Sequence, residues 1–453
     1  MADLRTNFAG IKSPNPFWLA SAPPTNSGAQ IHKAFEAGWG GAVWKTIGAP
    51  VLNVSNRYGA WHQGRQRMLA INNVELISDR PLEVNLREIV EIKRAWPDRA
   101  VIVSAMVESK PEVWRDIIHR IEDTGADGIE LNYGCPHGMS ERGMGSAVGQ
   151  VPEYSCMITE WVKEVARTPV LVKLTPNITD IRTVARAAKR GGADAVSAIN
   201  TINSITGIDL DTFTPRPNVG GLSAHGGYCG PAVKPIALHL VQQIASDPEV
   251  GLPISGIGGV AGWREAAEFF LLGCGTVQVC TAAMRYGYRI VEDMIDGLSQ
   301  WMDEKGLRTI DDFRGASLPK ITEWKHLDLN YRIVARINRD TCIGCELCYV
   351  ACWDGAHQCI HIDGHAKPAA LEAASHARIA TTPIAKLDAA EVNPSVTPSV
   401  RIPRVDEEEC VGCNLCWLVC PVENCITMEQ VETGKPYQSW EMRAAGAKAQ
   451  GQP

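Results

Sequence analysis

The sequence predicts an α/β chain in which an eight-stranded (β/α)8 barrel is followed by a smaller, cysteine-rich domain. Three observations support this prediction. Eight short apolar runs alternate with helical patterns over about the first 300 residues. The helical patterns often end in glycine turns just before the next run, as helix C-termini do. Ten of the fifteen cysteines lie after residue 340, in two repeated motifs.

The eight runs are rich in apolar and β-branched residues, as strands buried on both faces must be. They are Pro16–Ala22, Gly41–Ile47, Ala100–Met106, Gly128–Asn132, Pro169–Thr175, Ala195–Thr201, Pro253–Gly259 and Thr276–Ala282. Amphipathic stretches such as Ile31–Phe35 lie between most of them. This alternation predicts a parallel sheet, and eight units in about 300 residues fit a (β/α)8 barrel. A doubly wound open sheet is the alternative.

Polar side chains recur at or near the ends of these runs. They are Ser21, Lys45, Asn132, Lys173, Asn200 and Thr201. Any one of them could be a helix cap or a solvated loop residue. All of them together favour a site, because barrel enzymes place their active sites at the carboxyl-terminal ends of the strands.

Glycines end the seventh run, and Cys280–Thr281 ends the eighth. Gly256-x-Gly258-x-x-Ala261 nearly matches a dinucleotide-binding fingerprint, but no acidic residue is obvious about 20 positions further on. The phosphate site of a barrel is the better interpretation, because small residues let backbone N–H groups approach a phosphate. A flavin mononucleotide would suit a barrel with two lysines at its rim.

One cysteine, Cys135, lies on a glycine-flanked turn directly after the strand predicted at 128–132. The run L-N-Y-G-C-P-H-G (131–138) loses its hydrophobic period at this point, so we expect the turn to present the thiol to a site. Glycines and methionines alternate in residues 138–149, a composition that suits a mobile lid or an ordinary long loop.

Two runs spaced C-x2-C-x2-C-x3-C dominate the last hundred or so residues, and the second ends in Cys-Pro. In two-cluster bacterial ferredoxins the fourth cysteine of each run binds the other cluster. One [4Fe–4S] cluster is therefore expected on Cys342, Cys345, Cys348 and Cys420, and the second on Cys410, Cys413, Cys416 and Cys352. Zinc sites are the weaker alternative, since they lack this tandem spacing. Cys359 and Cys425 lie outside both motifs and are expected to be packing thiols.

The expected domains are a barrel at 1–310, a linker at 311–333 and a ferredoxin-like domain at 334–453 with an insertion at about 363–400. A tail at 444–453 is expected to be disordered. The net charge of −7, without a basic block, argues against nucleic acid as a partner. The absence of an apolar N-terminal region and of long apolar runs predicts a cytoplasmic protein that does not cross a membrane.

Taken together, these motifs resemble the FMN- and iron–sulfur-containing catalytic subunit of bacterial NAD-dependent dihydropyrimidine dehydrogenases, which is similar to the C-terminal part of the eukaryotic enzymes. The resemblance covers nearly the whole chain. Its most specific stretch is N-Y-G-C-P-H-G-M-S-E-R-G-M-G (132–145), supported by K-L-T-P-N (173–177), A-I-N-T (198–201) and N-N-V-E-L-I-S (72–78). Tyr133–Gly134 stands where Leu-Ser or Phe-Ser is more usual. The stretch between the two cysteine runs is long for the family.

The resemblance implies roles for the residues at the rim. Cys135 matches the catalytic cysteine. The substrate-binding positions are Asn73, Asn132, Asn200 and Thr201, with Glu75 beside them. The FMN-binding positions are Ser21, Lys45, Thr46, Lys173, Gly230, Ile257, Gly258, Gly259, Cys280 and Thr281.

The implied reaction is the reversible reduction of uracil and thymine to 5,6-dihydropyrimidines in pyrimidine degradation. Hydride would pass from FMN N5 to C6 and a proton from Cys135 to C5. Asparagine amides match the alternating C=O and N–H groups of a pyrimidine edge. The sequence has no second nucleotide-binding βαβ pattern, so electrons are expected from NADH through a partner flavoprotein that carries FAD and the NAD(H) site. The resemblance implies a dimer of such heterodimers.

Two other functions stay open. Dihydroorotate dehydrogenases share the barrel and a related Asn-x-x-Cys-Pro motif, but they carry no two-cluster domain in the same chain. Orotate would also need a further cationic or amide partner for its carboxylate. A non-catalytic flavin and iron–sulfur electron-transfer subunit is the second alternative, although a pure relay would need neither Cys135 nor the asparagines.

Overall fold

The computed structural model describes residues 2–63, 66–362 and 401–449. The chain divides into two compact units, Met1–Ile321 and Thr322–Pro453. The barrel limit expected at residue 310 lies inside the first unit, because the buried Phe313 packs edge-on against Phe270 and Trp301. Part of the expected linker, 311–333, therefore belongs to the barrel unit. The insertion expected at about 363–400 lies outside the described residues.

The first unit is a closed barrel of parallel strands. In chain order they are β3 (Phe17–Leu19), β4 (Gly41–Ile47), β7 (Ala100–Ala105), β8 (Gly128–Asn132), β9 (Val170–Lys173), β10 (Ala195–Ala198), β13 (Ile254–Ile257) and β14 (Cys274–Val279). Each overlaps a run expected from the sequence. The parallel pairing of β9 with β10 belongs to this closed ring, which confirms the (β/α)8 barrel and excludes the open sheet. Strands β4 and β7 are buried at every residue, hence their continuous apolar sequences.

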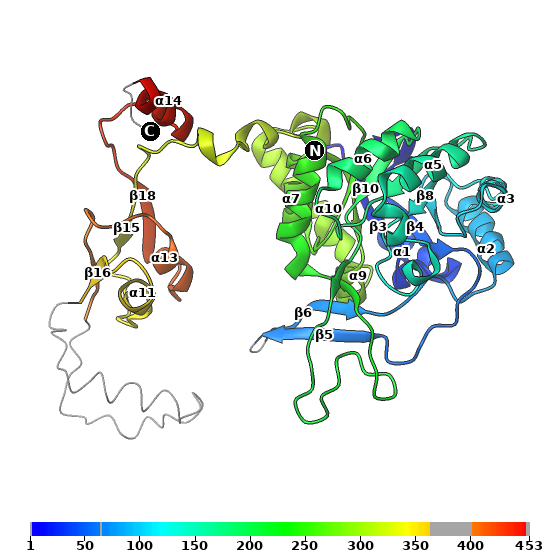
Figure 1. Cartoon of the computed structure of the whole chain (residues 1–453), viewed down its shortest axis with the longest axis horizontal. Helices are drawn as coiled ribbons and strands as arrows, with labels where there is room; N and C mark the ends of the chain where they lie inside the picture. The colour runs from blue at the N-terminus through cyan, green and yellow to red at the C-terminus, as the bar shows by residue number, and fades with distance from the viewer. Residues whose placement is uncertain (1, 64–65, 363–400, 450–453) are drawn as a thin grey trace. The chain divides into compact units, whose positions relative to one another are not determined.

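Helices surround the barrel (Figure 1). They are α1 (Gly28–Ala37), α2 (Leu82–Ala95), α3 (Pro111–Glu122), α5 (Pro152–Lys163), α6 (Ile181–Arg190), α7 (Lys234–Ala245), α8 (Trp263–Leu271) and α10 (Ile290–Lys305), with the shorter α4 (Ser146–Gly149) and α9 (Thr281–Tyr286). Their buried residues follow helical spacing, as Trp114, Ile117 and Ile121 do on α3. The hydroxyl of Ser27 accepts from the Gln30 N–H and fixes the start of α1.

Further strands lie outside the barrel ring. The hairpin of β1 (Thr6–Phe8) and β2 (Ile11–Ser13) packs Phe8 and Ile11 with Trp18 and Val43, near the amino-terminal ends of the barrel strands. The connections after β4 and β10 supply β5 (Tyr58–Gln63), β6 (Gln66–Asn73), β11 (Ile202–Ser204) and β12 (Gly226–Cys229). These four pair in the order β11-β12-β6-β5, all antiparallel. This sheet was not expected from the sequence, and its β5–β6 hairpin projects from the barrel in Figure 1.

The second unit is small and built around its cysteines. Strand β15 (Ile333–Ile337) pairs with β18 (Ile426–Gln430), and β16 (Ile360–His361) pairs with β17 (Arg404–Val405). The helical segments are α11 (Leu347–Tyr349), η7 (Val350–Asp354) and α13 (Leu415–Val419). Val334, Ile360 and Ile426 pack in one core with six buried cysteines. The cysteines thus replace much of the apolar core that a domain of this size would otherwise need.

The tail expected to be disordered is partly helical. Helix α14 (Trp440–Ala449) includes Ala444 and the residues after it that the structure describes. The reason is local: this stretch is rich in alanine, the best helix former, and Trp440 packs against Trp324 with ring centroids 6.0 Å apart. Within the described ranges, no helix combines the length and the apolar character needed to cross a membrane.

Candidate functional site

A cavity at the carboxyl-terminal end of the barrel strands gathers most of the rim residues. Its lining includes Ser21, Lys45, Thr46, Asn73, Glu75, Asn132, Cys135, Lys173, Asn200, Thr201, Ile257, Gly258 and Cys280. A second cavity shares Ile257, Gly258 and Cys280 with the first and adds Gly230, Gly259 and Thr281. Every barrel residue that the sequence analysis named as a candidate therefore lines one of two adjoining cavities.

The asparagines are held in a fixed arrangement. The Asn132 amide donates to the Thr46 hydroxyl at 2.9 Å, and the Asn200 amide donates to the Asn132 side-chain oxygen at 3.0 Å. The Asn73 amide donates to the Gly227 carbonyl at 2.9 Å, across the antiparallel sheet. Because each side chain is oriented by a neighbour, the cavity presents amide groups whose positions are set before a ligand binds.

Gly134 lets two of these elements meet. A Cβ at Gly134 would lie 2.4 Å from the Cβ of Asn200, so the Asn200 side chain packs directly on the glycine backbone. The preceding Tyr133 is fully buried, and its hydroxyl lies 3.2 Å from that of Thr159. The unusual Tyr133–Gly134 pair thus anchors the turn on one side and admits Asn200 on the other.

The Cys135 thiol is buried in this cavity and donates to the His137 carbonyl at 3.5 Å. Burial raises the pKa of Cys135 to about 11, although this hydrogen bond and the charge of Lys173 pull the pKa down. The thiol is therefore protonated at neutral pH. It packs against Met139 and Met144, which are buried in a small apolar cluster.

His137 is a cavity residue that the sequence analysis did not single out. Its Nε2 lies 2.9 Å from the Glu75 backbone carbonyl, which can only accept, so Nε2 carries the hydrogen. Burial lowers the pKa of His137, which keeps the ring neutral. Its Nδ1 is buried without a hydrogen-bond partner among the described residues, which leaves an acceptor available at the cavity wall. Its position two residues after Cys135 was the signal that could have revealed it.

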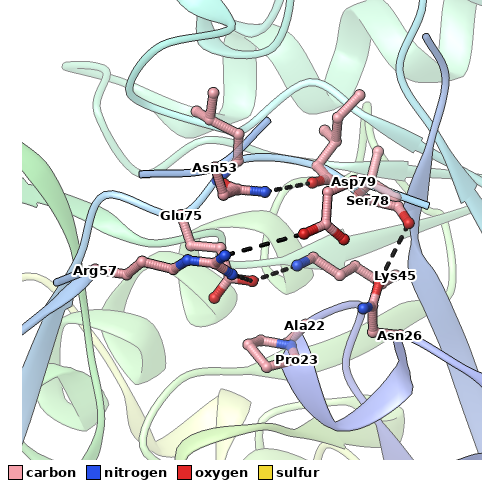
Figure 2. A network of polar contacts seen from close by, with 12 residues as sticks. Ala22, Pro23, Asn26, Lys45, Asn53, Arg57, Glu75, Ser78 and Asp79 are labelled. Carbon is pink, nitrogen blue, oxygen red and sulfur yellow. Dashed lines mark hydrogen bonds and ion pairs between the residues drawn. The ribbon is translucent and has the colours of Figure 1, made fainter. Parts of the chain in front are cut away.

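Glu75 joins the antiparallel sheet to the barrel (Figure 2). Its carboxylate accepts hydrogen bonds from Lys45 on β4 and from the hydroxyl of Tyr58, and Arg57 lies 3.3 Å away. Arg57 also lies 3.9 Å from the Asp79 carboxylate. Arg57 and Tyr58 could not be expected from the sequence, because they reach Glu75 only once the β5–β6 hairpin has formed.

Lys173 has its own buried partner inside the barrel. Its ammonium lies 3.6 Å from Glu130 Oε1, and the Glu130 side chain is completely buried. Ser197 donates to the other Glu130 oxygen at 2.8 Å, and Gln278 donates to it at 3.1 Å. Residues from four barrel strands therefore meet at this carboxylate. Glu130 and Gln278 are further residues that the sequence analysis did not identify.

Glycines shape the second cavity. Gly230, Gly258 and Gly259 adopt positive φ values of +104°, +131° and +75°, and a Cβ on Gly258 would lie 2.6 Å from that of Ala237. Only glycine combines this backbone conformation with such close packing. The guanidinium-bearing Arg285 lines the same cavity. A glycine-rich backbone beside an arginine is a fitting cradle for a phosphate group, because it lets backbone N–H groups approach the phosphate closely.

In the second unit the cysteines converge in two places. Cys342, Cys345, Cys348 and Cys420 line one small cavity, and Cys352, Cys410, Cys413 and Cys416 line another. The fourth cysteine of each motif thus lies with the first three of the other motif, which is the grouping expected from the sequence. Burial raises the pKa of Cys348 to about 12 and that of Cys416 to about 11. Such thiols become thiolates at neutral pH only when a metal displaces their protons, and four converging thiols suit an iron–sulfur cluster.

Comparisons with known proteins agree with this geometry. The family model for dihydroorotate dehydrogenase matches residues 3–302, and that for the 4Fe-4S dicluster domain matches residues 341–425. The NAD-dependent dihydropyrimidine dehydrogenase subunit PreA of Escherichia coli is 45% identical over 358 residues, which are 79% of this chain and 87% of the relative. The chloroplastic dihydropyrimidine dehydrogenase (NADP(+)) of Arabidopsis thaliana is 43% identical over 339 residues, which are 72% of this chain and 79% of the relative.

More distant relatives share the barrel. The catalytic subunit of dihydroorotate dehydrogenase B (NAD(+)) from Pyrococcus abyssi is 34% identical over 316 residues, which cover 70% of this chain and 99% of the relative. A crystal structure of the dihydroorotate dehydrogenase of Eimeria tenella in complex with ferulenol aligns with a TM-score of 0.56 at 18% identity. The alignment covers 69% of this chain and 88% of the Eimeria tenella chain, and at this level of identity it supports the fold alone.

These findings first define the class: an oxidoreductase with the barrel of a flavin-type dehydrogenase, joined in one chain to a 4Fe–4S dicluster domain. Within that class, the extent and level of identity to the bacterial and plant enzymes show that the chain belongs to the dihydropyrimidine dehydrogenase family. The family resemblance and the two-part architecture expected from the sequence are thereby confirmed.

Proposed function

We propose that this chain catalyses the reversible reduction of uracil and thymine to 5,6-dihydropyrimidines in pyrimidine degradation. The observation that carries the proposal is the meeting of a protonated thiol, Cys135, with three oriented asparagines in one cavity. The reaction adds a hydride and a proton to adjacent carbons of a flat, amide-rich ring. The cavity provides a proton donor and planar amide groups for such a ring.

FMN is the cofactor that the two adjoining cavities fit. Ser21, Lys45, Thr46, Lys173 and Cys280 would hold its ring system, and Gly230, Ile257, Gly258, Gly259 and Thr281 would hold its ribityl phosphate. When bound, FMN supplies the hydride that C6 of the pyrimidine receives. Lys45 and Lys173, each already paired with a carboxylate, would still offer N–H donors to the ring system of the reduced flavin.

The residues of this chain complete the reaction. Cys135 donates its proton to C5, and its raised pKa ensures that the proton is present at neutral pH. In the reverse direction the thiolate removes that proton. Asn73, Asn132, Asn200 and Thr201 bind the pyrimidine edge, while Glu75 holds Lys45. A ring that lacks the matching C=O and N–H groups would leave these buried amides unpaired, which gives the site its selectivity.

Two [4Fe–4S] clusters, on the two groups of four cysteines, would supply one-electron transfer within the chain. The Escherichia coli relative is named as a subunit, which supports a partner for this chain as well. We propose that the partner is a flavoprotein with FAD and an NAD(H) site, and that the assembly is a dimer of heterodimers.

An anaerobic titration tests the proposal. The chain, with its clusters and FMN in place, is reduced with four electrons per chain, two for FMN and one for each cluster, and mixed with an excess of uracil, thymine or orotate while the absorption of oxidised flavin is followed. Return of that absorption with uracil or thymine, together with formation of the dihydropyrimidine, is the expected result. If the Cys135→Ala variant has an unchanged FMN content but does not regain the absorption of oxidised flavin, Cys135 is assigned as the proton donor. No return with either pyrimidine would refute the proposed function.

A dihydroorotate-type activity is the second candidate, because the family model that matches the barrel carries that name. The charges in the cavity oppose it. Among the described residues that line the cavity, the cations are Lys45 and Lys173, and each is already paired with a buried carboxylate. The carboxylate of orotate would therefore lack an unpaired cation. Flavin reoxidation by orotate alone would favour this candidate.

A further inference from the structure

A fifth cysteine accompanies each group of four in the second unit. Cys359 lines the cavity of Cys352 and its three partners, and Cys425 lines the other cavity. Both precede an isoleucine that begins a short strand, β16 after Cys359 and β18 after Cys425. The two extra cysteines thus occupy equivalent places in the two halves of the unit. The expectation that they only fill space does not explain why each faces a cluster cavity.

Cys359 is in direct contact with one of the proposed cluster ligands. Its sulfur lies 3.4 Å from the sulfur of Cys352, and each residue is only 4% exposed. Both residues line the same cavity, so the sulfur of Cys359 lies next to the place that the Cys352 sulfur takes at its wall. Thiolate sulfur is also the ligand type that iron–sulfur clusters select.

The backbone keeps the two cysteines together. The Cys352 carbonyl accepts hydrogen bonds from the N–H groups of Ala356 and Gln358, at 3.1 and 3.0 Å. Gln358 adopts a positive φ of +61°, which turns the chain back toward the cavity directly before Cys359. Beyond this turn, Cys359 is held from its other side, since its carbonyl accepts from the Asp406 N–H at 2.7 Å. The position of Cys359 is therefore set by the backbone and does not depend on the side chain of Cys352.

We propose that Cys359 is a reserve ligand of the cluster bound by Cys352, Cys410, Cys413 and Cys416, and that it binds iron when Cys352 cannot. The inference rests on the ligand sets given under the proposed function. In the exchange, the bond from iron to Cys352 sulfur breaks and a bond from iron to Cys359 sulfur forms. Cys359 gives up its thiol proton to solvent, Cys352 takes one up, and no electron is transferred.

The test is the metal content of cysteine variants of the full chain, purified anaerobically. Iron and acid-labile sulfide are measured per chain, together with the electron paramagnetic resonance spectrum of the reduced protein. A chain with two [4Fe–4S] clusters holds about eight irons. Cys352→Ala should keep about that number, with altered g values for one cluster. The double variant Cys352→Ala/Cys359→Ala should fall to about four irons and lose one cluster signal.

Single variants distinguish a failure of the reserve role of Cys359 from a failure of the proposed ligand sets. Cys359→Ala alone should keep both clusters, because Cys352 is then in place. Cys413→Ala should lose one cluster, because Cys359 is held beside Cys352 by its backbone and would replace only that ligand. Equal iron loss in Cys352→Ala and in the double variant would overturn the reserve role while leaving the ligand sets intact. Full iron retention in both Cys352→Ala and Cys413→Ala would instead overturn the ligand sets, and the reserve role with them.

A labelling experiment covers the case in which the double variant does not fold. Native Cys352→Ala protein is treated with iodoacetamide before and after the iron is removed with a chelator, and the labelled cysteines are located by mass spectrometry. Bound to iron, Cys359 should resist labelling until the chelator is added. Labelling of Cys359 to the same extent before and after iron removal would contradict the inference. Cys359→Ser combined with Cys352→Ala gives a second, nearly isosteric double variant for the iron assay.

Discussion

The Lys45 ammonium and the Glu75 carboxylate form an ion pair at the wall of the main cavity, with side chains that are only 5% and 7% exposed. Lys45 belongs to barrel strand β4, and Glu75 lies just beyond β6 of the antiparallel sheet. The carboxylate also accepts from Tyr58, so its oxygens are already engaged by the chain itself. We infer that Glu75 acts on ligands mainly by positioning Lys45.

Replacing Glu75 by Gln should weaken flavin binding and leave the proton transfer from Cys135 intact. The amide cannot balance the charges of Lys45 and Arg57, so Lys45 loses its fixed position beside the cavity. We expect the Kd for FMN to rise about tenfold, the effect of losing one charged hydrogen bond. Equilibrium titration of the cofactor-free chain measures it. Asp79→Asn is the control, because Asp79 also pairs with Arg57 but does not line the cavity. Equal Kd values for the two variants would contradict the positioning role.

Replacing Cys135 by Ala should abolish turnover without abolishing binding. The variant keeps the asparagines and the glycine cradle, so FMN content and pyrimidine affinity should change little, whereas the loss of a general acid costs about 100-fold or more in rate. Single-turnover reoxidation of the reduced chain by uracil provides the rate, and pyrimidine-induced changes in the flavin spectrum provide the affinity. Cys156→Ala, on helix α5 outside both cavities, is a matched thiol control. Turnover near that of the unmodified chain would remove Cys135 from the mechanism.

The pH dependence should differ between the two directions of the reaction. Burial raises the pKa of Cys135 to about 11, so the thiol is protonated throughout the neutral range. As an acid it is then already in its active form, and the rate of pyrimidine reduction should stay level between about pH 6 and 9. As a base it must first lose its proton. The rate of dihydropyrimidine oxidation should therefore rise with pH, by up to about tenfold per pH unit. A reduction rate that falls with a midpoint near pH 8 would mean that the thiol ionises far more readily.

The buried pair of Lys173 and Glu130 should be important for stability. Glu130→Gln keeps an oxygen for Ser197 and Gln278 but leaves the Lys173 ammonium without its counter-charge inside the barrel. We expect a loss of about 3 kcal/mol in the free energy of unfolding of the cofactor-free chain, measured by urea denaturation. Glu164→Gln, which breaks the exposed pair with Arg115, should cost less than about 1 kcal/mol. Similar losses in both variants would show that Glu130 does not stabilise the barrel in this way.

The isolated chain should not couple NADH oxidation to uracil reduction. We propose that the NAD(H) site lies on a partner flavoprotein, so NADH has no route for its electrons into the isolated chain. Uracil-dependent oxidation of NADH, followed by absorbance, should begin only after that partner is added. A small-molecule reductant such as dithionite serves as the positive control, since it should support uracil reduction by the isolated chain. Robust NADH-dependent turnover without a partner would refute the partner requirement.

Much of the architecture could be predicted from local patterns. Buried parallel strands must be apolar throughout, so the segments that form β4, β7 and β8 are recognisable as continuous runs of such residues. The cysteine spacing specifies a cluster fold in the same local way. The antiparallel sheet was missed because its strands come from two connections far apart in the chain. Asn73 on β6 pairs with Gly227 on β12, a partner that no local pattern indicates.

The sequence by itself determined the barrel, the dicluster domain, and the set of side chains at the strand ends, because these depend on burial periodicity and on ligand spacing. Only the tertiary structure decided how those side chains are paired. Lys45 meets Glu75, Lys173 meets Glu130, and Cys359 meets Cys352. The first two contacts join separate strands and connections, and the third crosses a turn with a positive φ. Such contacts exist only after the sheet has closed and the turns have formed, because the energy of a charge or thiol pair depends on distances of a few ångströms.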